Sequence, residues 1–303
     1  MPSHRSGKPP IAPRIRAVRL DDIEIACTEI EAAPNADAPA RTLVLLHGLT
    51  GHRDDFLPLL SSLHAHDRSL RLLAPDLRGH GDSTHTGDPA TFCFDRLVED
   101  LGLLLDRLAI DRCDLVGHSF GGMVALRFAL ATPARLASLL LVGTAPFAPD
   151  AFRAETFEKS GDLAIARGMS FLQARIEERA RAGASNDGAQ RIADRWADAY
   201  WAHHRHRFRS MDPVAYRELG LTMVRQRSLE QRLCELSLPA SVVVGEHDAD
   251  FLAGAARIAE GIPGCIRFEI PDAGHHPHRE NPDAFLAALS AHLERPRTPP
   301  RTR

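Results

Sequence analysis

The chain has 303 residues, of which 44% are hydrophobic and 25% charged, so it can bury the core of one large folded domain. Its 37 basic and 40 acidic residues nearly cancel, which argues against the strongly basic surface that binds nucleic acid or an anionic membrane. We therefore expect a small-molecule substrate as the partner, with no nucleic acid and no membrane.

No apolar run approaches the roughly 20 residues that span a bilayer, and no apolar segment follows the basic N-terminus as in a secretory signal. The resulting expectation is a cytoplasmic protein. The five cysteines are scattered, without the spacing of zinc ligands or of a disulfide framework, so the sequence predicts no metal site.

Both ends of the chain, residues 1–13 and 295–303, are rich in proline and basic side chains, and we predict that they are disordered. Residues 14–30 alternate apolar and polar side chains. This pattern predicts an antiparallel hairpin that turns at Asp21 and Asp22.

Short apolar runs come next, and they are typical of parallel strands buried on both faces. These runs cover residues 42–46, 70–74, 113–116 and 139–142. Helical periodicity separates them at 91–108 and 120–131. The alternation of strand and helix predicts a doubly wound α/β sheet.

The alternation breaks between residues 148 and 229, where helical segments are predicted near 161–182, 188–208 and 213–225. Strands at 240–245 and 265–270 and a helix at 282–293 then resume the earlier pattern. The simplest organisation is a core made of residues 14–147 and 230–294, with a helical cap inserted at 148–229. Loops at the carboxyl ends of such a sheet are where ligands bind.

The sequence GHSFGG at residues 117–122 follows one predicted strand and precedes a predicted helix. A nucleophile on such a strained turn needs glycine on either side, which makes Ser119 the candidate nucleophile. Acyl transfer also needs two N–H donors where the oxyanion forms. The candidates are the N–H groups of Phe120, which follows the nucleophile, and of Leu49 in the HGL turn after the strand at 42–46.

With DLRGHGDS at residues 76–83 and LLHG at 45–48, the chain resembles the α/β-hydrolase superfamily, in its serine-nucleophile esterase and lactonase-like branch with a helical cap. The resemblance covers about 30–145 and 230–293. It implies an α/β-hydrolase fold, with a mostly parallel central sheet, flanking helices and an inserted helical cap.

The resemblance also extends to AGHHP at residues 273–277 and Glu-x-Pro beyond it. In the register of the family, His275 is the base, and His276 is its alternative. The family pattern Gly-x-x-Asp falls on GEHD at 245–248, which makes Asp248 the acid that orients the base. Asp250 and Glu246 are its competitors.

The candidate substrate pocket consists of His118, Trp196 and Tyr200. His118 is alternatively interpreted as a packing residue. Trp196 and Tyr200 share a helix face, and their alternative role is to pack the insertion against itself and against the sheet domain. Two further groups receive structural interpretations. Asp76, Arg78 and Asp82 are expected to tie loops together, and the basic segment at 203–209 is interpreted as a solvated helix face.

The leading functional hypothesis is a carboxylesterase-like serine hydrolase, which cleaves an ester or lactone of a small apolar or aromatic substrate without metal or organic cofactor. The same motifs resemble carbon–carbon bond hydrolases, cofactor-free perhydrolases and succinyl-hydroxycyclohexadiene carboxylate synthases, which are lyases. HGLTG at 47–51 and DDF at 54–56 are similar to the lyases. A non-catalytic ligand-binding protein is a further alternative.

Overall fold

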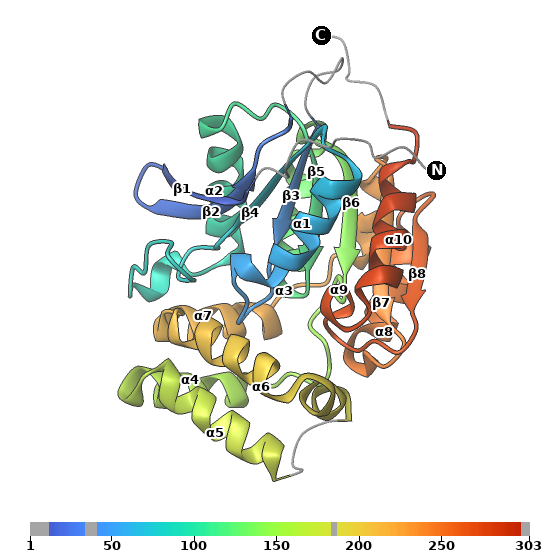
Figure 1. The fold of residues 1–303 in the computed structure, drawn as a ribbon. Helices are drawn as coiled ribbons and strands as arrows, with labels where there is room; N and C mark the ends of the chain where they lie inside the picture. The colour runs from blue at the N-terminus through green and yellow to red at the C-terminus, as the bar shows by residue number, and fades with distance from the viewer. Residues whose placement is uncertain (1–11, 34–40, 183–186, 298–303) are drawn as a thin grey trace, which may run out of the picture.

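The computed structural model describes residues 12–33, 41–182 and 187–297, and for 187–197 it describes the backbone but not the side chains. Eight strands form one sheet in the order β1-β2-β4-β3-β5-β6-β7-β8 (Figure 1). The strands are β1 (Arg14–Arg19), β2 (Glu24–Ile30), β3 (Arg41–Leu46), β4 (Leu70–Pro75), β5 (Cys113–His118), β6 (Leu136–Val142), β7 (Ala240–Gly245) and β8 (Ile266–Ile270). The pairs β1/β2 and β2/β4 are antiparallel and the others are parallel, which confirms the predicted fold class.

The apolar runs became strands because both faces of the sheet are covered. Every residue of β5, β6 and β7 is buried. The hairpin forms as predicted, with Arg19 opposite Glu24, and β1 at the edge of the sheet stays largely exposed. Continuous hydrophobicity in the central strands and alternation at the edge therefore have the same cause, the number of covered faces.

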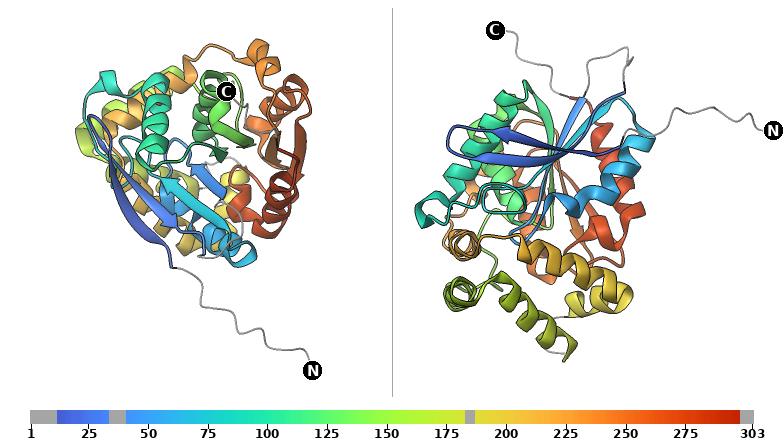
Figure 2. Two further views of the ribbon diagram at one scale, coloured as in Figure 1. Left: turned by 90° about the horizontal axis from the view of Figure 1, so that it is seen from above. Right: turned by 60° about the vertical axis from the view of Figure 1, so that its left-hand side comes forward.

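Helices cover both faces of the sheet (Figure 2). The helices of the described residues outside the insertion are η1 (Arg53–Phe56), α1 (Leu57–His66), η2 (Pro89–Thr91), α2 (Phe94–Arg107), α3 (Phe120–Ala131), η3 (Pro133–Arg135), η4 (Glu230–Glu235), α8 (Ala249–Gly261), α9 (Pro277–Glu280) and α10 (Pro282–Leu293). One hydrophobic cluster joins α2, α3 and α8 to the sheet, and a second joins α1 and α10 to it. Among these helices, only α2, α3 and α10 had been predicted from the sequence; α1, α8, α9 and the four short η helices had not.

In the described part of the insertion, four α-helices follow β6: α4 (Ala154–Arg167), α5 (Met169–Arg181), α6 (Asp187–Arg209) and α7 (Pro213–Val224). The single helix predicted near 161–182 is wrong, because the chain breaks at Gly168 into α4 and α5. Gly168 has a φ of 88°, a left-handed conformation that an α-helix cannot contain. Figure 1 shows these four helices gathered beyond the end of the sheet at which β6 ends.

Residues 1–11 and 298–303, which make up most of the two segments predicted to be disordered, lie outside the described residues. Among the described residues, no helix is both long enough and apolar enough to cross a bilayer.

Candidate active site

An alcohol, an imidazole and a carboxylate meet at the carboxyl ends of β5, β8 and β7. Ser119 directly follows β5, and its Oγ lies 2.9 Å from Nε2 of His275. Nδ1 of the same ring lies 3.0 Å from Oδ2 of Asp248, which follows β7. In this order the imidazole can take the proton of the alcohol while the carboxylate fixes the tautomer of the ring.

The turn that carries Ser119 is strained and tightly enclosed. Ser119 has a φ of 53°, and its N–H donates to the Val142 carbonyl oxygen at 2.8 Å. A Cβ at Gly117 would lie 2.5 Å from the Gly121 oxygen, and one at Gly121 would lie 2.4 Å from the His47 oxygen. Both glycines are therefore required by close backbone approach, as expected for a turn that holds a nucleophile.

The surroundings of His275 favour its protonated form. Burial alone would lower the pKa of the imidazole, but the charge of Asp248 and the hydrogen bond to it raise the pKa above its ordinary value of 6.5. Neither competing acid takes this place. Glu246 instead accepts a hydrogen bond from the N–H of Asp272 at 3.0 Å. Asp250 makes no hydrogen bond to His275, and its negative charge adds less to the pKa of the ring than that of Asp248.

Glu280 holds the loop that carries His275, a role that the sequence did not predict. Its carboxylate accepts hydrogen bonds from the N–H groups of Gly274 at 2.6 Å and of His276 at 2.7 Å. His118 Nε2 donates to the His275 carbonyl oxygen at 2.7 Å. The backbone on both sides of His275 is thus fixed by side chains, which orients the ring toward Ser119.

His276 and His118 pack against His275 as neutral rings. Their ring centroids lie 5.3 Å and 4.9 Å from that of His275. Burial lowers the pKa of His118 to about 3 and that of His276 well below 6.5. The structure therefore places His275, and not its sequence neighbour, against the hydroxyl of Ser119. Only 2% of the surface of His118 is exposed, as its interpretation as a packing residue expects, and its assignment to the substrate pocket stays a prediction.

Two histidines hold the turn that carries Leu49. His47 Nδ1 donates to the Gly48 carbonyl oxygen at 2.8 Å, while its Nε2 accepts from the Leu77 N–H at 3.0 Å. His80 Nε2 donates to the Leu49 carbonyl oxygen at 2.6 Å. Because C=O and N–H of one peptide point in opposite directions, holding the Gly48 oxygen aims the Leu49 N–H away from His47.

This turn touches the candidate nucleophile, since a Cβ at Gly48 would lie 3.2 Å from Cβ of Ser119. Among the described residues, the Leu49 N–H has no hydrogen-bond acceptor. The N–H of Phe120, at the first position of α3, has no acceptor inside the helix. The neighbourhood of Ser119 thus contains two donors that are free to bind an anion.

The loop at 76–83 has the structural role that was predicted for it. Asp76 pairs with Arg53 and accepts from the N–H of Asp82 at 3.1 Å. Arg78 pairs with Asp100 at 2.7 Å. These bonds confirm that Asp76 and Arg78 tie loops together, and they fix His80 against the turn of Leu49.

The interpretation of residues 203–209 as a solvated basic face is wrong for one side of this two-turn segment of α6. His204 and Arg207 are only 6% and 7% exposed, and His203 Nε2 lies 2.5 Å from Asp55 Oδ1 in η1. The spacing of basic residues did not show this, because the contact is made by a segment about 150 positions earlier in the chain. The basic residue types alone therefore led to a wrong prediction that this face of α6 is exposed to solvent.

Of the two aromatic pocket candidates, Trp196 lies where the side chains are not described. Tyr200 packs edge-on against the buried Trp201, with ring centroids 4.9 Å apart, which is the contact expected if it cements the insertion. Two groups among the described side chains could hold a metal ion, namely His52, Asp54 and His206, and Glu246, His247 and Asp272. Neither group includes Ser119, Asp248 or His275.

Most of the chain is similar in sequence to known proteins. The family described as alpha/beta hydrolase fold matches residues 41–282. The chain is 27% identical to a candidate 2-succinyl-6-hydroxy-2,4-cyclohexadiene-1-carboxylate synthase of Bacillus subtilis (strain 168), over 87% of this chain and 93% of that one. It is 30% identical to a candidate carbamate hydrolase, RutD, of Variovorax paradoxus (strain S110), over 78% and 86%.

The structure is also similar to that of a thermophilic esterase from Thermogutta terrifontis with malate bound. The TM-score is 0.76, the identity is 25%, and the match covers 92% of this chain and 98% of that one.

Proposed function

The chain belongs to the alpha/beta hydrolase fold family, and from this premise we propose that it is a serine hydrolase that cleaves a small carboxylic ester or lactone. The observation that carries the proposal is the unbroken line of contacts from Ser119 Oγ through the His275 ring to Asp248, at 2.9 Å and 3.0 Å.

In the proposed mechanism, Ser119 Oγ attacks the substrate carbonyl carbon while His275 Nε2 takes its proton. The tetrahedral oxyanion binds the N–H groups of Leu49 and Phe120, and the macrodipole of α3 adds to their effect. The protonated His275 then gives its proton to the leaving alkoxide, and an acyl-enzyme remains. A water molecule, deprotonated by the same ring, hydrolyses this ester and frees Ser119.

The inserted helices α4 to α7 are proposed to form a cap over this site, with Trp196 and Tyr200 as candidate contacts of the acyl group. The cap at 148–229 joins the core at the loops that leave β6 and enter β7. Its place beyond the strand ends supports the proposal, because ligands of open α/β sheets bind there (Figure 1).

Covalent labelling tests the proposed function. We expect a fluorophosphonate to modify the protein at one site, because only a serine with a positioned base reacts readily with it. Short p-nitrophenyl esters and simple lactones should be hydrolysed by the same preparation. Intact-mass spectrometry and peptide mapping to Ser119 provide the measurement. A protein that resists the label and hydrolyses none of these substrates would refute the proposal.

One observation favours a second candidate, a carbon–carbon bond hydrolase or a lyase similar to the succinyl-hydroxycyclohexadiene carboxylate synthases. Among the described residues, the guanidinium of the buried Arg207 has no hydrogen bond or ion pair, and its Nε is buried without a partner. Within the described part of the chain, the Arg279 guanidinium has one ion-pair partner, Asp55, at 4.0 Å. The Asp55 carboxylate already binds His203 and the His52 N–H. Asp55 also feels the charge of Arg207, so one carboxylate faces a buried and a half-buried cation.

A buried cation without a partner is costly, and an anionic group of a substrate would compensate it. Burial lowers the pKa of Arg279, and the charge of Arg207 lowers it further, so the two cations are near each other. Arg207 also acts on His276, which adjoins His275. A substrate with a carboxylate, as expected for the lyases, would suit this charge.

The variant Arg207→Met distinguishes the two candidates. If the substrate is anionic, KM for the mono-p-nitrophenyl ester of succinic acid rises by about 10-fold or more, while p-nitrophenyl acetate is unaffected, because a hydrogen bond to a charged group contributes about 1.5–3 kcal/mol. Arg209→Met changes an exposed arginine of the same helix and serves as control. Equal changes for both esters would leave Arg207 a structural residue and favour a neutral substrate.

A further inference from the structure

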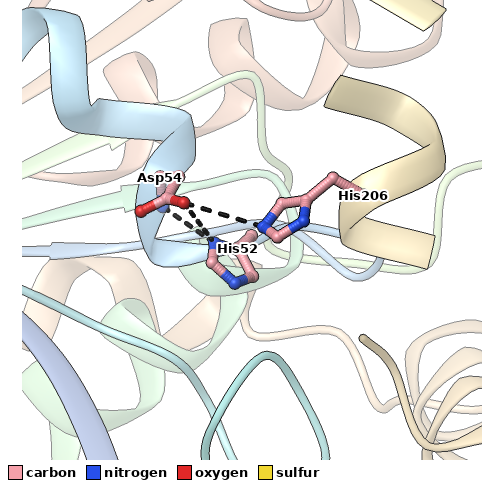
Figure 3. A group of neighbouring side chains, drawn as sticks. All are labelled: His52, Asp54 and His206. Atoms are coloured by element: carbon pink, nitrogen blue, oxygen red, sulfur yellow. Dashed lines mark hydrogen bonds and ion pairs between the residues drawn. The ribbon is translucent and has the colours of Figure 1, made fainter. Parts of the chain in front are cut away.

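His52, Asp54 and His206 form a cluster that the proposed hydrolysis does not use (Figure 3). His52 precedes η1, Asp54 belongs to η1, and His206 extends from the last turns of α6. Oδ2 of Asp54 lies 3.5 Å from Nδ1 of His52 and 3.7 Å from Nε2 of His206. All three ligand atoms lie within 4.8 Å of one another.

The two separations from Asp54 match the coordination of a zinc ion. Zinc binds imidazole nitrogen and carboxylate oxygen at about 2.1 Å, so two ligands of a tetrahedral site lie about 3.4 Å apart. The two distances to Asp54, 3.5 Å and 3.7 Å, are close to that edge length. An ion could therefore be bound with little movement of the backbone.

The tautomer of the His52 ring leaves its Nδ1, the nitrogen next to Asp54, without a proton. Its Nδ1 accepts the Asp54 N–H at 3.1 Å, so the proton of the neutral ring is on Nε2. Nε2 lies 3.8 Å from Oδ1 of Asp76, on the far side of the ring from Asp54. A metal-binding histidine commonly has a carboxylate behind its second nitrogen, and binding here would replace the Asp54 N–H with the ion.

The cluster combines one buried ring with two side chains that are partly open to solvent. The side chain of His52 is 1% exposed, whereas those of Asp54 and His206 are 35% and 43% exposed. An ion could thus enter from solvent and bind against a fixed buried ring. The other group, Glu246, His247 and Asp272, lacks such a ring, because the side chains of Glu246 and His247 are 48% and 33% exposed.

We propose that His52, Asp54 and His206 bind one Zn²⁺ ion. Two imidazoles and one carboxylate are ligands that suit zinc, and three protein ligands leave the fourth position to water. The ion would cross-link α6 of the insertion to η1 of the sheet domain, and so join two segments about 150 positions apart in the chain. This site is independent of the proposed hydrolysis, since it contains none of the residues of that mechanism.

Titration of the metal-free full-length protein with Zn²⁺ tests the site. We expect isothermal titration calorimetry to give one bound ion per chain, and the melting temperature to rise with zinc because the ion binds the folded form. Co²⁺ in place of zinc should give the visible absorption bands of a four-coordinate site. His206→Ala and Asp54→Asn should each weaken zinc binding by more than about 10-fold and remove the cobalt bands.

His247→Ala is the matched control, because it disrupts the other group of possible ligands, and it should leave zinc binding unchanged. Zinc binding that persists in both His206→Ala and Asp54→Asn, or that is lost in His247→Ala, would overturn the proposal. So would a wild-type protein that binds no zinc. Both ligands chosen for substitution are partly exposed, and circular dichroism and the melting temperature without metal verify that the variants fold.

Discussion

The variant Ser119→Ala is expected to lose kcat for ester hydrolysis by about 10⁴-fold or more, since removal of the nucleophile in a serine hydrolase leaves only binding and oxyanion stabilisation. The variant should fold normally. Alanine at a φ of 53° is strained no more than serine, and the Ser119 N–H and carbonyl oxygen keep their bonds to Val142 and Thr144.

The measurement is kcat with a p-nitrophenyl ester, together with fluorophosphonate labelling and the melting temperature. Ser170→Ala, which changes an exposed serine of α5, is the control and should keep both the activity and the label. A Ser119→Ala protein that still reacts with the fluorophosphonate would show that the nucleophile is another residue. A loss of activity accompanied by unfolding would be assessed with Ser119→Cys, which retains a nucleophile in the same turn.

The second large effect is a loss of activity when the base is removed, and it distinguishes His275 from its neighbour His276. His275→Ala should lower kcat/KM by about 10⁴-fold, because Ser119 loses its base. His276→Ala should lower it by less than about 10-fold, because the neutral His276 ring only packs beside His275. The two variants are compared by kcat/KM and by melting temperature, since both remove a ring from the same cluster. Comparable losses in the two variants would contradict the assignment of the base.

The pH dependence of the wild type gives a second measure of the base. His275 must be neutral to accept a proton, and Asp248 raises its pKa. The value of kcat/KM should therefore rise with pH through a midpoint above 6.5, the ordinary pKa of the ring. In Asp248→Asn the midpoint should fall, because burial then lowers the pKa without an opposing charge. An unchanged midpoint in this variant would contradict the role of Asp248.

Much of the fold follows from hydrophobic patterning. The buried strands β3 to β7 were predicted within a few residues, because a strand covered on both faces must be apolar throughout. The helix α3 was predicted with its observed bounds, Phe120–Ala131. The division of α4 from α5 was missed because the composition around Gly168 stays helical, and only a left-handed backbone marks the break.

By itself, the sequence determined the sheet, the glycine-bounded turn of Ser119 and the order in which Ser119, Asp248 and His275 occur. These features are local, since close packing and strand burial restrict which residues can stand at each position. The tertiary structure decided the rest, because the remaining contacts join residues far apart in the chain. It brought His275, rather than His276, against Ser119, and it placed Glu280, His47 and His80 behind the site. It also joined His206 to His52 and Asp54, which no spacing along the chain could have shown.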